Sequence, residues 1–163
     1  MIKISLFQTK LFVVFVILML TGPVAKCELP HIIIDKCNLR LYLIENNDTI
    51  MNVEVCVGRN YGDKKRIGDC RTPEGNFTIC QIQDSQLWQH DFGDGYGYRK
   101  GAYGPLFLRL KIPKWNSIGI HGTCFPSSIG SRNSEGCIRL RNDDLLELYK
   151  YVSINTKVTI LPD

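Results

Sequence analysis

The chain has 163 residues, 44% of them hydrophobic, which is enough for one well-packed domain and too few for two. Three lysines, Lys3, Lys10 and Lys26, lie near the N-terminus, so most of the formal charge of +4 belongs there and the rest of the chain is nearly neutral. The chain has no basic tract with interleaved aromatic residues, which argues against nucleic acid as a partner.

Residues 1–26 have the layout of a secretory signal peptide. Lys3 and Lys10 supply the positive end, and the unbroken apolar run at 11–20 has the length of a signal-peptide core. That run is too short for a comfortable membrane span, which needs about 20 residues. We therefore predict a signal peptide here, with an uncleaved N-terminal anchor as the alternative.

Residues 25–27 determine whether the segment is cleaved or carries a lipid. We expect cleavage after Ala25; lipid attachment at Cys27 is the other reading, although Lys26 stands where a small residue is usual. In either case residues 27–163 form one exported domain, periplasmic or associated with the cell envelope. It would touch a membrane only through its N-terminal segment.

Alternating apolar and polar residues predict β-strands through most of this domain. Runs at 32–34, 39–44 and 49–57 have strand composition, and turn-forming residues follow the second run at 45–48 and the third at 58–63. The pattern therefore begins with short strands joined by tight turns.

Four more strands are predicted further along the chain. A Thr-Pro-Glu-Gly turn leads into a strand at 76–82, and further strands are expected at 106–110, 118–121 and 157–161. Most neighbours in such a series pair antiparallel.

One helix is predicted, directly after Asn142. Asn142 is a suitable N-cap, and acidic residues follow it in the first turn, where the helix dipole favours them. The apolar residues at helical spacing are Leu145, Leu146, Tyr149 and Val152. The predicted fold is mainly β, a β-rich and sandwich-like domain with one α-helix in its C-terminal half.

Residues 83–104 differ in composition from the rest, because glycine and aromatic residues alternate there. A long loop of this kind is commonly a lid or a wall of a binding site. The alternative is a surface loop packed by its own aromatic side chains.

The chemistry points to residues 118–140. His121 and Gly122 end one apolar run, and Gly136 and Cys137 open another, with a turn-rich loop between them. A thiol attacks as its thiolate, which a nearby imidazole can generate, and an ion pair between the two would lower the thiol pKa. The Gly122 carbonyl is the expected orienting acceptor for His121, and the backbone N–H groups around Gly136 and Cys137 would hold an oxyanion.

Other interpretations of these residues remain open. His121, Cys124 and Cys137 are also candidate zinc ligands, although no second histidine or CxxC pair completes the set. His121 is otherwise interpreted as a buried histidine of the core. Beside Cys137, six cysteines are available for three disulfides, and a Cys124–Cys137 bond would silence the thiol. The six are Cys27, Cys37, Cys56, Cys70, Cys80 and Cys124.

At these residues the chain resembles the catalytic domain of the L,D-transpeptidases, the YkuD-like enzymes of the bacterial cell wall. The matching segments are Ile120-His121-Gly122-Thr123, Pro126-Ser127-Ser128-Ile129-Gly130, Ser134-Glu135-Gly136-Cys137-Ile138-Arg139-Leu140, Asn142-Asp143 and Thr156-Lys157-Val158-Thr159-Ile160. Two departures stand out: many family members have His in place of Glu135 and Asn in place of Arg139. By position, residues 83–104 resemble the family's flap over the substrate cleft, and His90 within them is not expected to be the base.

The resemblance implies a peptidoglycan L,D-transpeptidase that uses neither metal nor cofactor. Cys137 would be the nucleophile and His121 its base, while Ser134, Gly136 and Arg139 would shape the site, Arg139 by binding a carboxylate. The implied partners are peptidoglycan stem peptides and, as another acceptor, a lipoprotein. Hydrolysis would make the protein a carboxypeptidase, and a non-catalytic wall-binding domain is the rival of another class. The order of His before Cys argues against a papain-like peptidase.

Overall fold

The computed structural model describes residues 29–163, so the predicted signal segment and Cys27 lie outside the described part of the chain. The elements are β1 His31–Asp35, β2 Arg40–Glu45, β3 Asp48–Glu54, β4 Val57–Gly58, β5 Gly75–Asp84, β6 Gln89–Asp91, β7 Tyr98–Lys100, β8 Leu106–Leu110, β9 Gly119–His121, a 3-10 turn Pro126–Ser128, β10 Arg132–Ser134, β11 Ile138–Arg139, α2 Asn142–Tyr149 and β12 Lys157–Ile160. No helix of residues 29–163 is both long and apolar enough to cross a membrane.

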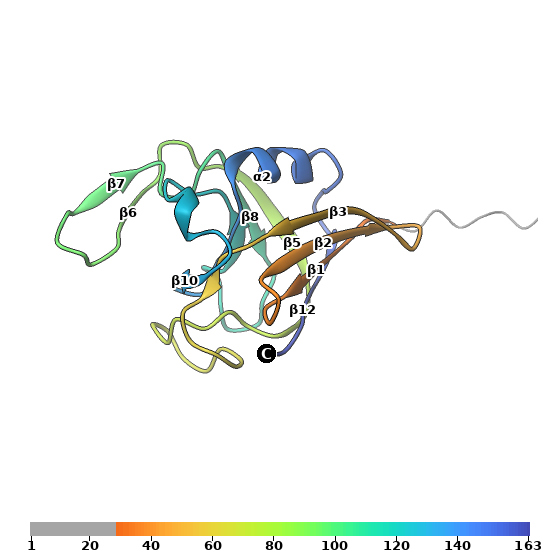
Figure 1. Cartoon of the computed structure of the whole chain (residues 1–163), viewed down its shortest axis with the longest axis horizontal. Coiled ribbons are helices and arrows are strands. Elements are labelled where there is room, and N and C mark those ends of the chain that lie inside the picture. The colour runs from red at the N-terminus through yellow and green to blue at the C-terminus, as the bar shows by residue number, and fades with distance from the viewer. Residues whose placement is uncertain (1–28) are drawn as a thin grey trace, which may run out of the picture.

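One curled sheet of eight strands forms the body, in the order β11-β9-β8-β5-β12-β1-β2-β3 (Figure 1). Its neighbours run antiparallel except for the pairs β1–β12 and β9–β11, which are parallel. The predicted β-rich domain with one α-helix and a mostly antiparallel sheet is confirmed. The parallel pair β9–β11 brings the two halves of the predicted catalytic motif to one edge of the sheet.

The strands β1 and β2 show how the apolar pattern fixes the sheet. Ile32 and Ile34 of β1, and Leu41 and Leu43 of β2, are fully buried, and pairing sets Ile32 opposite Leu43. Burying each of these side chains contributes about 1.5–3 kcal/mol. A slip of one residue would expose all four, so the register of the hairpin is strongly determined.

The predicted strand at 49–57 is divided into β3 and β4 in the structure. After β3 the chain leaves the edge of β2, and Cys56 forms two backbone hydrogen bonds with Arg139, of 2.9 and 2.8 Å. The backbone of β11 is thus held between Cys56 on one side and β9 on the other. The break interrupts the strand, and the contact of Cys56 with Arg139 fixes the position of β11, directly after Cys137.

The helix α2 is found where it was expected, but its cap and part of its apolar face were wrong. Asn142 is the first helical residue, and no side chain caps the helix. Leu145 and Leu148 are buried, whereas Leu146 and Tyr149 are 43% and 45% exposed. Leucines occupy both faces of this short helix, so spacing alone did not identify the face that meets the core. Figure 1 shows α2 lying across the upper edge of the sheet.

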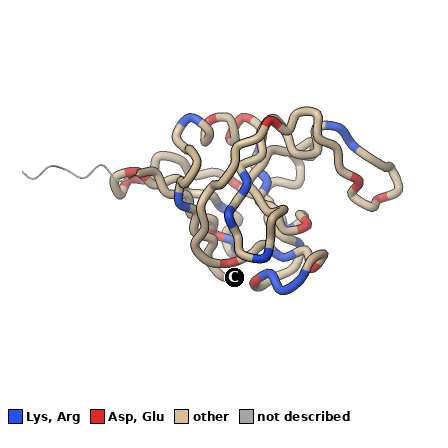
Figure 2. Tube along the Cα trace, turned by 180° about the vertical axis from the view of Figure 1, so that it is seen from behind, with Lys and Arg blue, Asp and Glu red and all other residues tan. Residues whose placement is uncertain are grey.

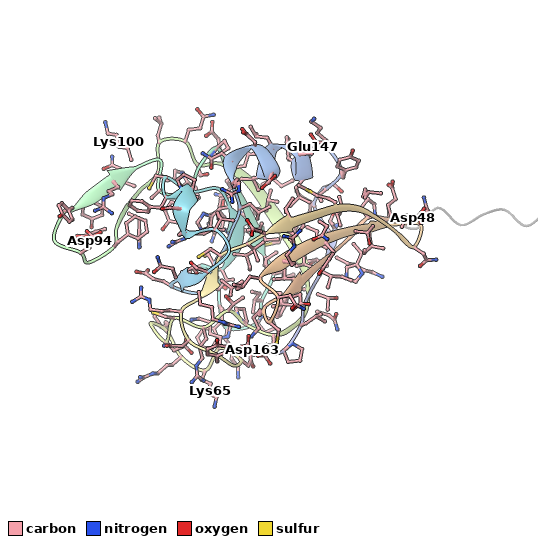
Figure 3. All side chains as sticks on the ribbon, viewed as in Figure 1. Asp48, Lys65, Asp94, Lys100, Glu147 and Asp163 are labelled. Atoms are coloured by element: carbon pink, nitrogen blue, oxygen red, sulfur yellow. The ribbon has the colours of Figure 1, made fainter. Side chains whose placement is uncertain are left out.

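The segment predicted as a long loop contains a second, small sheet. Strands β6 and β7 pair antiparallel and, with residues 92–97 between them, form what we call the flap hairpin. The flap hairpin projects from the body at the left of Figure 1. Figure 3 labels Asp94 in its connecting turn and Lys100 where it returns to the body.

Cysteine pairing differs from the expectation. All six cysteines of the described chain are free, so the three disulfides are not formed and Cys124 is not bonded to Cys137. One of them, Cys56, is wholly buried among apolar strands, where it packs as a small hydrophobic residue. The nucleophile predicted at Cys137 is therefore available as a thiol.

Acidic and basic residues alternate along the described trace. Figure 2 shows Lys and Arg interspersed with Asp and Glu, and the flap hairpin at the right carries both signs. Among residues 29–163, Lys36 is the largest fully buried side chain, and its ammonium group pairs with Glu74 at 2.7 Å and with Asp163 at 3.0 Å. These pairs tie the C-terminal end of the chain to the loop after β1.

Candidate active site

Two strand ends create the site. β9 ends at His121, and β11 begins directly after Cys137, with Ile138 beside Ile120 and Arg139 beside His121. Because the two strands are parallel and adjacent, the loop between them returns the chain so that thiol and imidazole reach the same cleft. That cleft has a volume of about 770 Å³ and includes both residues in its lining.

His121 is held rigidly by aromatic rings and by one carbonyl. It is 3% exposed, and its ring stacks on Phe107 at a centroid distance of 5.3 Å and lies 4.9 Å from Tyr103. Its Nδ1 lies 2.6 Å from the carbonyl oxygen of Gly122, the acceptor expected from the sequence. A carbonyl only accepts, so Nδ1 carries the hydrogen and Nε2 is left with a lone pair.

The imidazole of His121 is neutral at ordinary pH. Burial lowers its pKa to about 3, and the positive charge of Arg139 acts in the same direction, while hydrogen bonding to the backbone of Gly122 and of Tyr103 partly opposes both. A neutral imidazole with a lone pair on Nε2 is the form that accepts a proton.

The thiol of Cys137 is likewise neutral. Burial raises its pKa, and so does Glu135; a hydrogen bond from the Gly119 backbone and the charge of Arg139 only partly offset this. The side chain keeps partial exposure to the cleft, and Sγ lies 3.4 Å from the Ser117 carbonyl oxygen. The ion pair expected from the sequence is therefore not the resting state: both groups favour the uncharged form.

The turn before Cys137 requires glycine at position 136. Gly136 has φ +130°, and a Cβ there would meet the Arg71 carbonyl oxygen at 2.8 Å. Thr72 Oγ1 donates to the Gly136 carbonyl at 2.9 Å. The turn therefore fits closely against residues 71–72, and no side chain separates it from them.

Ser134 locks the same turn from within. The serine is fully buried; its Oγ accepts from the Gly136 N–H at 3.0 Å and donates to the Cys137 carbonyl at 2.6 Å. The Gly136 N–H is thus already engaged. Of the two N–H groups expected at an oxyanion, the one of Cys137 is the better candidate.

Arg139 presents an unused donor inside the site. It is 6% exposed, lines the cleft, and its guanidinium lies 5.4 Å from the ring centre of Phe92 in the flap hairpin. Among residues 29–163 its Nε is buried without a hydrogen-bond partner. A guanidinium in the wall of the cleft suits recognition of a carboxylate.

Asn142 is a site residue that the sequence analysis misplaced. Its Oδ1 accepts from the Thr123 N–H at 2.9 Å, and a Cβ on Gly122 would meet that same oxygen at 2.2 Å. The side chain expected to cap α2 instead positions the peptide after His121, whose carbonyl orients the imidazole. Its distance in sequence from Gly122 gave no signal of this contact.

His90, which the sequence did not predict as the base, lines the cleft. His90 Nε2 lies 3.1 Å from Glu135 Oε2, and Nδ1 lies 3.2 Å from the hydroxyl of Tyr103. All three residues line the cleft that holds Cys137. The signal in the sequence was weak, because the three come from separate segments.

The alternative zinc site is not formed. Within residues 29–163 no three side chains of His, Cys, Asp or Glu gather closely enough to hold a metal ion, and that includes His121, Cys124 and Cys137. The histidine instead has aromatic and backbone neighbours on its two faces and at Nδ1.

Comparisons with known proteins agree with this geometry. The model of the L,D-transpeptidase catalytic domain family, YkuD, matches residues 30–160. The YkuD protein of Bacillus licheniformis, whose name places it among the L,D-transpeptidases, is 34% identical over 124 residues, 76% of this chain and 59% of that protein. The YkuD protein of Bacillus subtilis is 32% identical over 130 residues, 80% of this chain and 65% of that protein. The chain therefore spans about three fifths of the length of these relatives.

Solved structures share the fold at low sequence identity. The L,D-transpeptidase of Enterococcus faecium superposes with a TM-score of 0.61 at 19% identity, covering 82% of this chain and 50% of that one. The L,D-transpeptidase of Xylanimonas cellulosilytica gives a TM-score of 0.59 at 17% identity, covering 83% of this chain and 62% of that one. At such identities the likeness shows the fold.

Proposed function

We propose, from the premise that this chain belongs to the YkuD family of L,D-transpeptidase catalytic domains, that its cleft transfers acyl groups on peptidoglycan stem peptides with Cys137 as nucleophile. The observation that carries the proposal is the parallel pairing of β9 and β11, which delivers a thiol and a buried neutral imidazole to one cleft. The family and its enzymatic nature follow from the match over residues 30–160.

The reaction has two halves. In the first, Cys137 attacks the peptide bond between the third and fourth residues of a tetrapeptide stem, D-Ala leaves, and a thioester remains. In the second, an amine of a neighbouring stem attacks the thioester and forms a 3→3 cross-link. Each half needs one proton removed from the nucleophile and, in the first, one delivered to the leaving amine.

His121 is assigned the proton transfers around Cys137. Since thiol and imidazole are both neutral at rest, the proton moves from Sγ to Nε2 as attack proceeds, and then to the departing D-Ala amine. The buried site makes the imidazolium short-lived, which favours prompt delivery to the leaving group. In the simplest scheme His121 also accepts the proton of the incoming amine.

The remaining site residues are assigned to binding and shape. The Cys137 N–H is the proposed oxyanion donor, with Gly136 and Ser134 fixing the turn that aims it. Arg139 is assigned to a substrate carboxylate, because its guanidinium lines the cleft and can bind a carboxylate through two parallel hydrogen bonds. Gly122 orients His121 through its carbonyl.

The acceptor and the location belong to the same proposal. Water as acceptor would make the enzyme a carboxypeptidase, and an amine on a lipoprotein would attach that protein to the wall. We infer export to the cell envelope from the signal-like residues 1–26 and from the substrate. Peptidoglycan is the proposed partner, and a membrane is involved only if the N-terminal segment is retained or lipidated.

The decisive experiment incubates the exported domain with disaccharide-tetrapeptide and follows the products by mass spectrometry, beside Cys137→Ala. We expect a cross-linked dimer with loss of D-Ala in the parent, and no product in the variant. A tripeptide alone would assign carboxypeptidase activity. No product from the parent, under reducing conditions that keep its thiols free, would reject catalysis and leave a wall-binding domain.

A further inference from the structure

A hydrogen-bonded chain of three side chains lies beside Cys137 and has no part in the scheme above. Glu135 Oε2 lies 3.1 Å from His90 Nε2, and His90 Nδ1 lies 3.2 Å from the hydroxyl of Tyr103. Both nitrogens of one imidazole are therefore engaged, one with a carboxylate and the other with a hydroxyl. This is the order of groups by which a carboxylate and an imidazole activate a hydroxyl.

The three members come from different parts of the fold. Glu135 precedes the catalytic turn, His90 lies in β6 of the flap hairpin, and Tyr103 lies just before β8. Ser85 holds the segment of Tyr103 to the body, since its hydroxyl donates to the Gly104 carbonyl at 2.9 Å. Convergence of three segments on one imidazole places a proton-carrying chain at the wall of the cleft.

Aromatic contacts fix the orientation of this chain. The ring of His90 meets Phe92 edge-on at 4.6 Å and Tyr103 at 5.8 Å. The ring of Tyr103 in turn lies 4.9 Å from that of His121. The Tyr103 hydroxyl therefore belongs to a positioned side chain in the wall of the cleft.

The protonation states fit a relay. A carboxylate only accepts, so His90 donates from Nε2 to Glu135. In the tautomer that has its single hydrogen on Nε2, Nδ1 has a lone pair and accepts from the Tyr103 hydroxyl. Burial raises the pKa of Tyr103, and Cys137 and Glu135 add to this, so the phenol keeps its proton and remains a donor. The Tyr103 hydroxyl, the His90 imidazole and the Glu135 carboxyl group thus form one continuous hydrogen-bonded chain.

We propose that Tyr103, His90 and Glu135 form a second proton relay that serves the incoming amine, while His121 serves the thiol and the leaving group. The relay rests on the proposed function, which it deepens by assigning the acceptor half-reaction its own base. Tyr103 is the member that meets the acceptor amine; His90 and Glu135 act through it.

In the transfer step the amine replaces Cys137 on the acyl group, and the relay carries away one proton. The amine nitrogen forms a bond to the thioester carbon, the C–S bond breaks, and its electron pair returns to Cys137 Sγ. The surplus amine proton passes to Tyr103 Oη while the Tyr103 proton passes to His90 Nδ1, and Glu135 stabilises the resulting imidazolium. His90 then releases its proton to solvent, from which the thiolate is protonated again.

The test separates the two half-reactions. Single-turnover release of D-Ala measures acylation, and formation of cross-linked product from the acyl-enzyme measures transfer; both are followed in the parent, Tyr103→Phe and Glu135→Gln. Removal of a proton-transfer group costs roughly 10²–10⁴-fold in the step that it serves. We expect Tyr103→Phe to lower transfer at least about tenfold more than acylation, and Glu135→Gln to do so more weakly because it keeps the hydrogen bond but not the charge.

The matched control is Tyr98→Phe, which also removes a tyrosine hydroxyl, from a residue of the flap hairpin that is 74% exposed. A second readout uses hydroxylamine as acceptor. Its nitrogen must also lose a proton after attack, but that nitrogen is more acidic than the nitrogen of an alkylamine, so the loss in Tyr103→Phe should shrink. Equal losses in acylation and transfer, an unchanged loss with hydroxylamine, or a Tyr98→Phe effect equal to that of Tyr103→Phe would reject the relay. An absence of acyl-enzyme in the parent would instead reject the proposed function, and the relay with it.

Discussion

The two walls of the cleft are built by different means. The first wall contains the end of β9 and the turn before β11, and we call it the strand-end wall. Backbone contacts and buried side chains hold it: Ser134 is fully buried, and His121 is 3% exposed. Gly136 packs against residues 71–72 so closely that no side chain fits between them. The flap hairpin is held by side chains, and its Tyr96 and Tyr98 are 82% and 74% exposed. Figure 3 shows the flap hairpin extending well beyond the body that carries the strand ends.

This difference separates reactivity from substrate fit. Groups that exchange protons need fixed positions, and the sheet supplies them through β9 and β11. Contacts with a variable substrate suit a segment that few buried residues hold in place. Variants of the strand ends should therefore change kcat and stability, and variants of the exposed residues of the flap hairpin should change KM. His90 is the exception within the hairpin, because Glu135 and Tyr103 hold its ring at the cleft and the proposed relay gives it a part in proton transfer.

The largest effect is expected at the imidazole of the strand-end wall. His121→Gln removes the lone pair that takes the Cys137 proton, and kcat/KM for D-Ala release should fall by roughly 10²–10⁴-fold. Alkylation of Cys137 by iodoacetamide at neutral pH should slow as well, because the thiol pKa is already raised by burial. Parent-like alkylation and turnover in the variant would remove His121 from the role of base.

The next effect concerns the turn of the same wall. Gly136→Ala forces a side chain into a left-handed position and against the Arg71 carbonyl, so the free energy of unfolding should fall by about 1–3 kcal/mol. Activity should fall further than stability, since the turn aims the Cys137 N–H. Gly62→Ala is the matched control: its φ is also positive, at +82°, but a Cβ there meets nothing within 4 Å. Urea denaturation of both variants measures the difference, and equal losses would contradict the steric argument.

Most features that depend on neighbouring residues in the sequence were predicted correctly. The strands, the helix position and the pairing of His121 with the Gly122 carbonyl came from local patterns: alternation, helical spacing and adjacency. Such signals lie within a few residues of one another, and local geometry determines them.

Features that depend on distant contacts were missed. The role of Asn142 depends on Thr123, the relay at His90 depends on Glu135, and the neutral state of Cys137 depends on burial by the completed fold. None of these has a periodic or adjacent signature. The prediction of three disulfides was wrong for a related reason. An even number of cysteines gives no information on which of them the fold brings close enough to bond.

The pH dependence of stability should sharpen the comparison on the side of the strand ends. His121 has a pKa of about 3 when folded and 6.5 ordinarily, so the unfolded chain binds the proton more readily. Stability is therefore complete above about pH 6.5 and falls as pH drops towards 3, by at most about 1.4 kcal/mol per pH unit. For Cys137, with a raised pKa, stability is complete below its ordinary value of 9.0 and falls as pH rises beyond it.

Denaturation from pH 4.5 to 10 tests both limbs. His121→Gln should flatten the acid limb and Cys137→Ala the alkaline one. The control for the acid limb is His31→Gln, because burial and Lys157 lower the pKa of His31 in the same direction but from a partly exposed position. If His31→Gln flattens the acid limb and His121→Gln does not, the burial argument for His121 is wrong.

The smallest effect is expected at the flap hairpin. Arg99 pairs with Asp94 at 2.8 Å and lies 4.8 Å from the ring centre of Phe125, so it joins the hairpin to the loop that follows β9. Exposed ion pairs and cation–π contacts contribute about 0.5–1 kcal/mol each, so Arg99→Ala should leave the melting temperature nearly unchanged. If that contact serves mainly to hold the hairpin over the substrate, its loss should raise KM by about two- to fivefold with little change in kcat, a range that corresponds to the same energy. Lys100→Ala, on the same strand, should change neither. A fall in kcat of Arg99→Ala at constant KM would mean that Arg99 acts on the chemical step and not on substrate fit.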